Sequence, residues 1–201
     1  MECRAPAGGH KNMKYDPEIH QRHSIRLPGF DYARAGAYYL TIVSHGREEL
    51  FGTVVDGEMK LNQTGQMVDQ AWHDLPTHYP HVELDAFCIM PNHVHGIIIL
   101  KDDFNDGEGA SHVGVVGAGL RPAPTRGTHT RTRHPLSEIV RAFKSFSARR
   151  INALRVSPGI PVWQRNYYEH IIRDNQDYLA KSNYILDNPR NWMKDNENPQ
   201  L

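Results

Sequence analysis

The sequence predicts an α+β fold in which helices cover one side of an antiparallel sheet. Three observations lead to this class. Strand-like segments follow one another before residue 101, hairpin-type turn signals join them, and few helical patterns alternate with single strands. Since parallel strands would need long crossover connections, usually helical, we expect antiparallel pairing, with the second face of the sheet left for a partner.

Strands are predicted from runs of β-branched and aromatic residues. The first covers residues 37–44 (AYYLTIVS), and residues 52–61 form a hairpin around Asp56-Gly57, a pair that accepts the positive φ of a tight turn. Two more strands are expected at Val82 to Ile89 and His93 to Leu100. The intervening Met-Pro-Asn favours a turn, so these two strands should pair in antiparallel fashion.

Helices are predicted where apolar residues recur three and four positions apart. One runs from about Thr64 to Leu75, with Asn62 or Thr64 as its N-cap. A second, amphipathic and basic, follows Pro135 and reaches Leu154. After a short strand-like piece at residues 161–164, a last helix extends from about Asn175 to Asn188, where Pro189 ends it.

Length and composition indicate one globular domain. The chain has 201 residues, of which 39% are hydrophobic, and it lacks the run of about 20 apolar residues that a membrane span needs. We expect a cytoplasmic protein without membrane association, because no secretory signal is visible at the N-terminus. The predicted domain covers residues 25–195, with a flexible insert at 101–134 and tails at 1–24 and 196–201.

The charge distribution indicates a nucleic-acid partner although the formal net charge is zero. Residues 121–155 contain nine basic residues and one acidic residue. Such a segment suits a phosphate backbone, and a solvated helix face remains an equally good interpretation. The candidate DNA-binding residues are Arg141, Lys144, Arg149, Arg150 and Arg165.

A His-x-His pair at the start of an apolar strand is the candidate metal site. Because side chains alternate along a strand, His93 and His95 point to the same face and could bind one ion. Two unremarkable histidines in a strand are also common. A histidine-triad hydrolase is disfavoured, since it would need a third histidine at Ile97.

The last helix offers a further ligand and a nucleophile. Tyr184 and Asn188 are four residues apart and therefore share a helix face, and the carbonyl oxygen of Asn188 is a ligand that a hard cation accepts. A tyrosine one turn from a metal ligand is a candidate nucleophile. A partly buried stripe with Asn188 at the helix end is the alternative interpretation.

Five ordered motifs resemble a known family. RHSIRLPGFDYARAGAYYLTIV, LFGTVVDGEMKLNQTGQMV, MPNHVHGIII, VWQRNYYEHIIRD and YILDNP look like those of the REP-associated tyrosine transposases, which belong to the HUH endonuclease class (His, bulky hydrophobic residue, His). The resemblance covers about residues 22–193 without the insert. It implies a ferredoxin-like sheet with helices packed on one face.

The resemblance also implies roles for particular residues. His93 and His95 match the HUH pair, Asn188 the third metal ligand and Tyr184 the nucleophile. Tyr167 and Tyr168, in the RNYYEHIIR motif, are a competing pair of tyrosines, with Tyr167 as the alternative nucleophile. The implied cofactor is Mg²⁺ or Mn²⁺, and the implied reaction is the cleavage and rejoining of single-stranded DNA with hairpin or palindromic ends through a 5′-phosphotyrosine.

Three function classes remain on the sequence alone. The first is an active bacterial transposase or nickase, and the second is a domesticated DNA-hairpin-binding protein that no longer transposes. The third, a replication or conjugation initiator, normally accompanies its nuclease with a larger assembly such as a helicase, for which 201 residues leave little room. The sequence leaves open whether the protein acts as a monomer or as a homodimer in which one protomer's tyrosine serves its partner's histidines.

Overall fold

A computed structural model describes residues 29–102 and 133–199. The predicted N-terminal tail and residues 103–132 of the predicted insert lie outside these ranges. Six strands and four α-helices make up the described part, in this order: β1 (Gly36–Val43), β2 (Gly52–Val55), β3 (Glu58–Leu61), α1 (Gln63–His73), α2 (Leu75–His78), β4 (Val82–Ile89), β5 (His93–Leu100), α3 (Leu136–Leu154), β6 (Tyr168–Ile172) and α4 (Asn175–Asp187). Two 3₁₀ turns, η1 (His45–Arg47) and η2 (Pro189–Lys194), follow β1 and α4.

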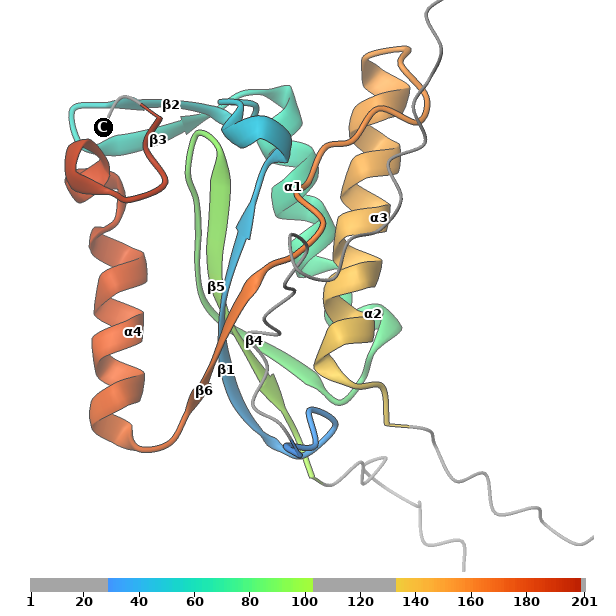
Figure 1. The fold of residues 1–201 in the computed structure, drawn as a ribbon, viewed down its shortest axis with the longest axis vertical. Coiled ribbons are helices and arrows are strands. Elements are labelled where there is room, and N and C mark those ends of the chain that lie inside the picture. Colours follow the sequence, from blue (N-terminus) through green and yellow to red (C-terminus); the bar gives the residue numbers. More distant parts are fainter. Residues whose placement is uncertain (1–28, 103–132, 200–201) are drawn as a thin grey trace, which may run out of the picture.

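The main sheet has four antiparallel strands in the order β4-β5-β1-β6 (Figure 1). Helix α1 lies between β1 and β4 in the chain, and α3 lies between β5 and β6. This connectivity and strand order are those of a ferredoxin-like fold. The predicted fold class is therefore confirmed, and β1 and β5 occupy the two central positions.

Local signals explain most element boundaries. The β2–β3 hairpin turns at Asp56 and Gly57, which both have positive φ, as the sequence predicts. Helix α1 starts where Asn62 Oδ1 accepts a hydrogen bond from the backbone N–H of Gly65 at 2.9 Å. Helix α3 follows directly after Pro135, whose fixed φ suits a helix start.

The last strand differs from the prediction. Residues 161–164 form no strand and contribute only an isolated bridge between Trp163 and Ser44, whereas the edge strand is β6. Polar Glu169 and His170 interrupt β6, so the segment lacks the apolar run that marks a strand in sequence. Backbone pairing with β1 makes this segment a strand, although its composition does not predict one.

Helices cover both faces of the sheet, contrary to the prediction that they pack on one face only. Helices α1 and α3 enclose the larger core, around Trp72 and Phe143, and α4 lies on the opposite side (Figure 1). There Ile185 packs with Tyr39 and Ile97 in a smaller cluster. Because Ile185 is the only fully buried residue of α4, the apolar stripe of this helix is narrow, and its docking side could not be read from the pattern.

Within residues 29–102 and 133–199, no helix is long and apolar enough to cross a membrane.

Candidate active site

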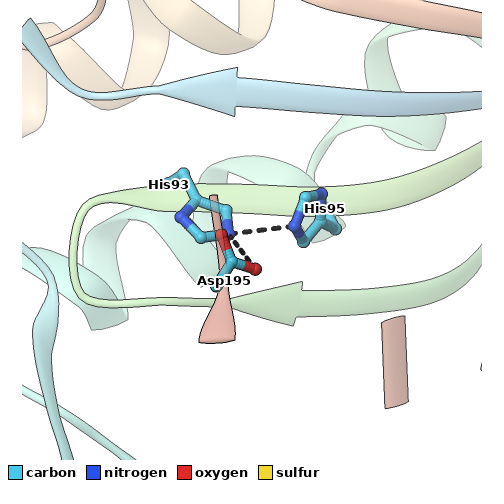
Figure 2. Close-up of side chains that lie close together, drawn as sticks. All are labelled: His93, His95 and Asp195. Atoms are coloured by element: carbon cyan, nitrogen blue, oxygen red, sulfur yellow. Dashed lines mark hydrogen bonds and ion pairs between the residues drawn. The ribbon is translucent and has the colours of Figure 1, made fainter. Parts of the chain in front are cut away.

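The two histidines of β5 meet on the sheet face that α4 partly covers. Alternation along the strand places both rings on this face, where they are buried. The Nε2 atoms of His93 and His95 are 2.9 Å apart. Figure 2 shows the two rings on one strand, with Asp195 reaching them from the C-terminal segment.

The orientation of His93 is set by its neighbour in the chain. Asn92 Oδ1 lies 2.8 Å from His93 Nδ1, while the amide nitrogen of Asn92 donates to the backbone carbonyls of Arg47 and Glu197. These two bonds fix which end of the amide is oxygen. His93 Nδ1 therefore carries the proton and donates it, which leaves the lone pair of Nε2 directed toward His95.

His95 is held by two hydroxyl groups of β1. Its Nδ1 atom lies 2.8 Å from Tyr39 Oη and 2.9 Å from Thr41 Oγ1, and either oxygen can accept a hydrogen bond from the ring N–H. With Nδ1 protonated, His95, like His93, keeps an Nε2 lone pair available for an ion. Two nitrogen ligands at about 2.1 Å from one ion and at right angles are about 3 Å apart, which agrees with the observed separation.

Burial keeps both imidazoles neutral. It lowers the pKa of His93 well below the ordinary value, although the nearby Asp195 carboxylate acts in the opposite direction. Burial also lowers the pKa of His95, and the proximity of His93 lowers it further. Neutral imidazole is the metal-binding form, so neither ring has to lose a proton near pH 7.

A carboxylate that sequence reasoning missed completes the cluster. Asp195 Oδ2 lies 4.0 Å from His93 Nε2, and one ligand atom each from His93, His95 and Asp195 fall within 4.8 Å of one another. The backbone N–H of Glu197 donates to Asp195 Oδ1 at 2.7 Å and holds the carboxylate in place. No spacing rule points to Asp195, because η2 reverses the chain and brings this residue back to β5.

The predicted helix residues lie beside this cluster. Asn188 is buried, its amide nitrogen donates to Asp195 Oδ2 at 2.8 Å, and its Oδ1 atom has no partner. Tyr184 is 48% exposed, and its hydroxyl donates a long hydrogen bond of 3.4 Å to the same Oδ2. The Tyr184 ring centroid lies 5.2 Å from that of His95.

The donor set fits a divalent cation. Two neutral imidazole nitrogens, one carboxylate and an unpartnered amide oxygen suit Mn²⁺ well and also accept Mg²⁺ or Zn²⁺. The orphaned Asn188 Oδ1 is the most direct sign, because a buried carbonyl without a partner is costly unless a donor or an ion satisfies it.

Comparisons with known proteins agree with the predicted resemblance. No family model matches the chain. An uncharacterised protein of Haemophilus influenzae is 39% identical over 182 residues, which cover 90% of this chain and 96% of that protein.

A second H. influenzae protein, which carries the name of a REP-associated tyrosine transposase, is 28% identical over 159 residues, 79% of this chain and 73% of its own length. The solved structure of a REP-associated tyrosine transposase bound to a REP hairpin superposes with a TM-score of 0.52 at 19% identity and covers 85% of this chain and 74% of that chain, which shows a shared fold.

The chain is thus similar in sequence to a protein named as a REP-associated tyrosine transposase, and it shares the fold of the solved one. The resemblance stated from its motifs is confirmed, and the similarity supports a transposase-family role.

The candidate tyrosines divide between the two faces of the sheet, and Tyr168 shares the histidine face with Tyr184. Tyr184 lies beside the histidines, whereas Tyr167 packs against the larger core on the side of α1 and α3. The Lys144 ammonium lies 5.5 Å from the Tyr167 ring centroid.

The five predicted DNA-binding residues divide into two groups. Arg141, Arg149 and Arg165 are exposed. Lys144 instead donates to the backbone carbonyls of residues 164, 165 and 166, and Arg150 pairs with Asp74. Burial lowers the pKa of Lys144 to about 8. All four residues of α3 belong to the helix layer opposite the histidine face.

Proposed function

We propose that this protein cleaves and rejoins single-stranded DNA beside a hairpin, with Tyr184 as the nucleophile. The observation that carries the proposal is the position of the Tyr184 hydroxyl, which donates to Asp195 Oδ2 in the buried cluster that contains His93 and His95. The partner class is supported by the solved relative, which is bound to a REP hairpin.

The reaction is a transesterification. Tyr184 Oη attacks the scissile phosphorus as the bond from phosphorus to the 3′ oxygen breaks, which yields a 5′-phosphotyrosine and a free 3′-OH. The phenol loses one proton and the leaving oxygen gains one, so the step is proton-neutral overall. Attack by a different 3′-OH reverses the step and joins two strands.

The chain's own residues prepare this step. Burial and the Asp195 carboxylate raise the pKa of Tyr184 to about 12, so the hydroxyl is protonated at neutral pH and Asp195 orients it through their hydrogen bond. His93, His95, Asn188 and Asp195 would hold Mg²⁺ or Mn²⁺ there. The bound cation would supply positive charge that stabilises the phosphate as negative charge builds up on it.

Basic side chains would neutralise the DNA backbone. Arg141 and Arg149 on α3 are exposed and suited to phosphates of a hairpin stem. Arg165 lies in the segment that leads to the edge strand β6. A DNA strand that passes from the α3 side of the sheet to the histidine face would cross this edge. Lys144 and Arg150 also belong to the proposed basic surface, although both have internal partners.

A covalent-adduct assay tests the proposal. Hairpin oligonucleotides with single-stranded flanks are incubated with the protein and Mn²⁺ or Mg²⁺, and an SDS-resistant adduct is measured. We expect an adduct with the wild type and the Tyr167→Phe variant, and none with Tyr184→Phe. An adduct that survives Tyr184→Phe and disappears in Tyr167→Phe would reverse the assignment. Hairpin binding without any adduct would favour a binding protein that no longer cleaves.

A further inference from the structure

We propose that Tyr168 and Lys181 form a binding subsite for the nucleotide that flanks the scissile phosphate, with Tyr168 stacking on the base and Lys181 pairing with a phosphate. The inference rests on the proposed function and extends it to residues outside the catalytic cluster. It starts from a group of rings and one cation around Tyr39.

Tyr39 is a buried ring that connects this pair of residues to the catalytic cluster. Its ring stacks on His95 with centroids 5.6 Å apart. The rings of Tyr168 and Tyr184 both approach it edge-on, each with a centroid distance of 6.3 Å. Lys181 Nζ lies 5.0 Å from the Tyr39 centroid. Tyr168 and Lys181 are thus one side chain away from the proposed nucleophile.

Tyr168 is a partly exposed aromatic residue on the histidine face. It belongs to the edge strand β6, pairs with Thr41 of β1, and is 43% exposed on the histidine face. Its neighbours Glu169 and Ile171 point to the other side of the strand, so alternation directs Tyr168 and His170 toward the site. An exposed ring beside a proposed phosphate-cleaving centre offers a π-face to an unpaired base.

Lys181 supplies the only cation of α4 that faces this site. It lies one turn before Tyr184, and Asp177, four residues earlier on α4, interacts with its charge without a salt bridge within 4.0 Å among the described residues. A lysine whose ammonium lies over the Tyr39 ring and forms no close salt bridge is suited to a phosphate.

An exposed ring and a cation beside one buried tyrosine suit the chemistry of single-stranded DNA. A single strand presents a base and a phosphate in alternation. Proteins that bind it without sequence preference stack aromatic side chains on the bases and place basic side chains near the phosphates. Duplex DNA would not expose its base faces to Tyr168. The subsite therefore selects unpaired DNA next to the reacting phosphate, independently of its sequence.

Binding measurements in EDTA test the subsite without cleavage. The probe is a fluorescent stem-loop oligonucleotide with about eight thymidines on each side, together with a series in which one flanking nucleotide at a time is abasic. We expect Tyr168→Leu to weaken binding about tenfold and Tyr168→Phe, which keeps the ring, to leave it within about twofold. On one probe of the abasic series the penalty of Tyr168→Leu should disappear, because the base that it stacks on is missing.

Salt dependence tests Lys181. Replacement by methionine should reduce the slope of log affinity against log salt by about 0.7, the value for one phosphate contact on a single strand. Lys101→Met is the matched control, because Lys101 is 50% exposed at the far end of β5 and pairs with Glu83. Its slope should equal that of the wild type.

Failure of this inference differs from failure of the proposed function. An equal Tyr168→Leu penalty on every abasic probe, or an unchanged slope for Lys181→Met, would overturn the subsite even if adducts form. The penalty of Tyr168→Leu could disappear on one abasic probe although the protein forms no adduct with any metal. That result would overturn the proposed cleavage activity and leave the subsite as a binding site for single-stranded DNA.

Discussion

Asn188 and Asp195 are joined by a 2.8 Å hydrogen bond from the amide nitrogen of Asn188 to Oδ2 of Asp195. This bond connects the end of α4 to the C-terminal segment and determines the orientation of the amide, so that Oδ1 of Asn188 is its free acceptor. Each residue thereby holds the other beside His93, and the site depends on a segment that comes after the last helix.

Removing the Asp195 charge should weaken metal binding. Asp195→Asn keeps the shape but loses the negative charge nearest to the histidines, and we expect Mn²⁺ affinity to fall at least about tenfold. Asp187→Asn, which changes an exposed carboxylate at the end of α4, is the control. Isothermal titration with Mn²⁺ measures both, and equal affinities would show that Asp195 is not a ligand.

Asn92 should act through His93. In Asn92→Ala, His93 Nδ1 loses its acceptor, and the carbonyls of Arg47 and Glu197 lose a donor. Mn²⁺ affinity should fall by about 10- to 100-fold, as for other groups that orient a ligating histidine. Unfolding by urea should become easier by about 1–3 kcal/mol because buried polar groups are left unpaired. A metal affinity that stays at the wild-type value would mean that packing alone orients His93.

Acid should destabilise the metal-free protein through its histidines. Their pKa values are lowered by burial, so the unfolded chain takes up protons near pH 6.5 while the folded site does not. Stability is therefore complete above about pH 6.5 and decreases as the pH falls below it. Between pH 7.5 and 5.5, each histidine should contribute a loss of up to about 1.4 kcal/mol.

Urea unfolding in EDTA at these two pH values provides the comparison. His95→Gln should lose less stability than the wild type, because one protonation site in the unfolded chain is removed. An equal loss in both proteins would contradict the assignment of neutral, buried rings.

Gly96→Ala should destabilise the fold by about 1–3 kcal/mol through overpacking. A Cβ on Gly96 would lie 2.5 Å from Cζ2 and 2.6 Å from Cη2 of Trp72, whose ring is stacked on Phe87. Combination with Trp72→Phe, which removes these two atoms, should recover part of the loss. Thermal unfolding of the three variants measures this, and additive losses would show that the clash is not with Trp72.

Local patterns in the sequence determined most of the fold. The bounds of β4 and β5 agree with the prediction, the hairpin turns at Asp56 and Gly57, and α1 starts at the predicted Asn62 cap. Side-chain alternation alone places His93 and His95 on one face, because a strand repeats every two residues. Helical spacing likewise puts Tyr184 and Asn188 on one side of α4.

Tertiary structure decided what no local period encodes. The narrow apolar stripe of α4 did not show that this helix docks on the histidine face, and the polar residues of β6 hid an edge strand. Asp195 became part of the cluster only because η2 reverses the chain, and Asn92 and Tyr39 became partners of the histidines through folding contacts. Contacts between residues far apart in the chain depend on packing and chain reversal, which spacing along the sequence does not specify.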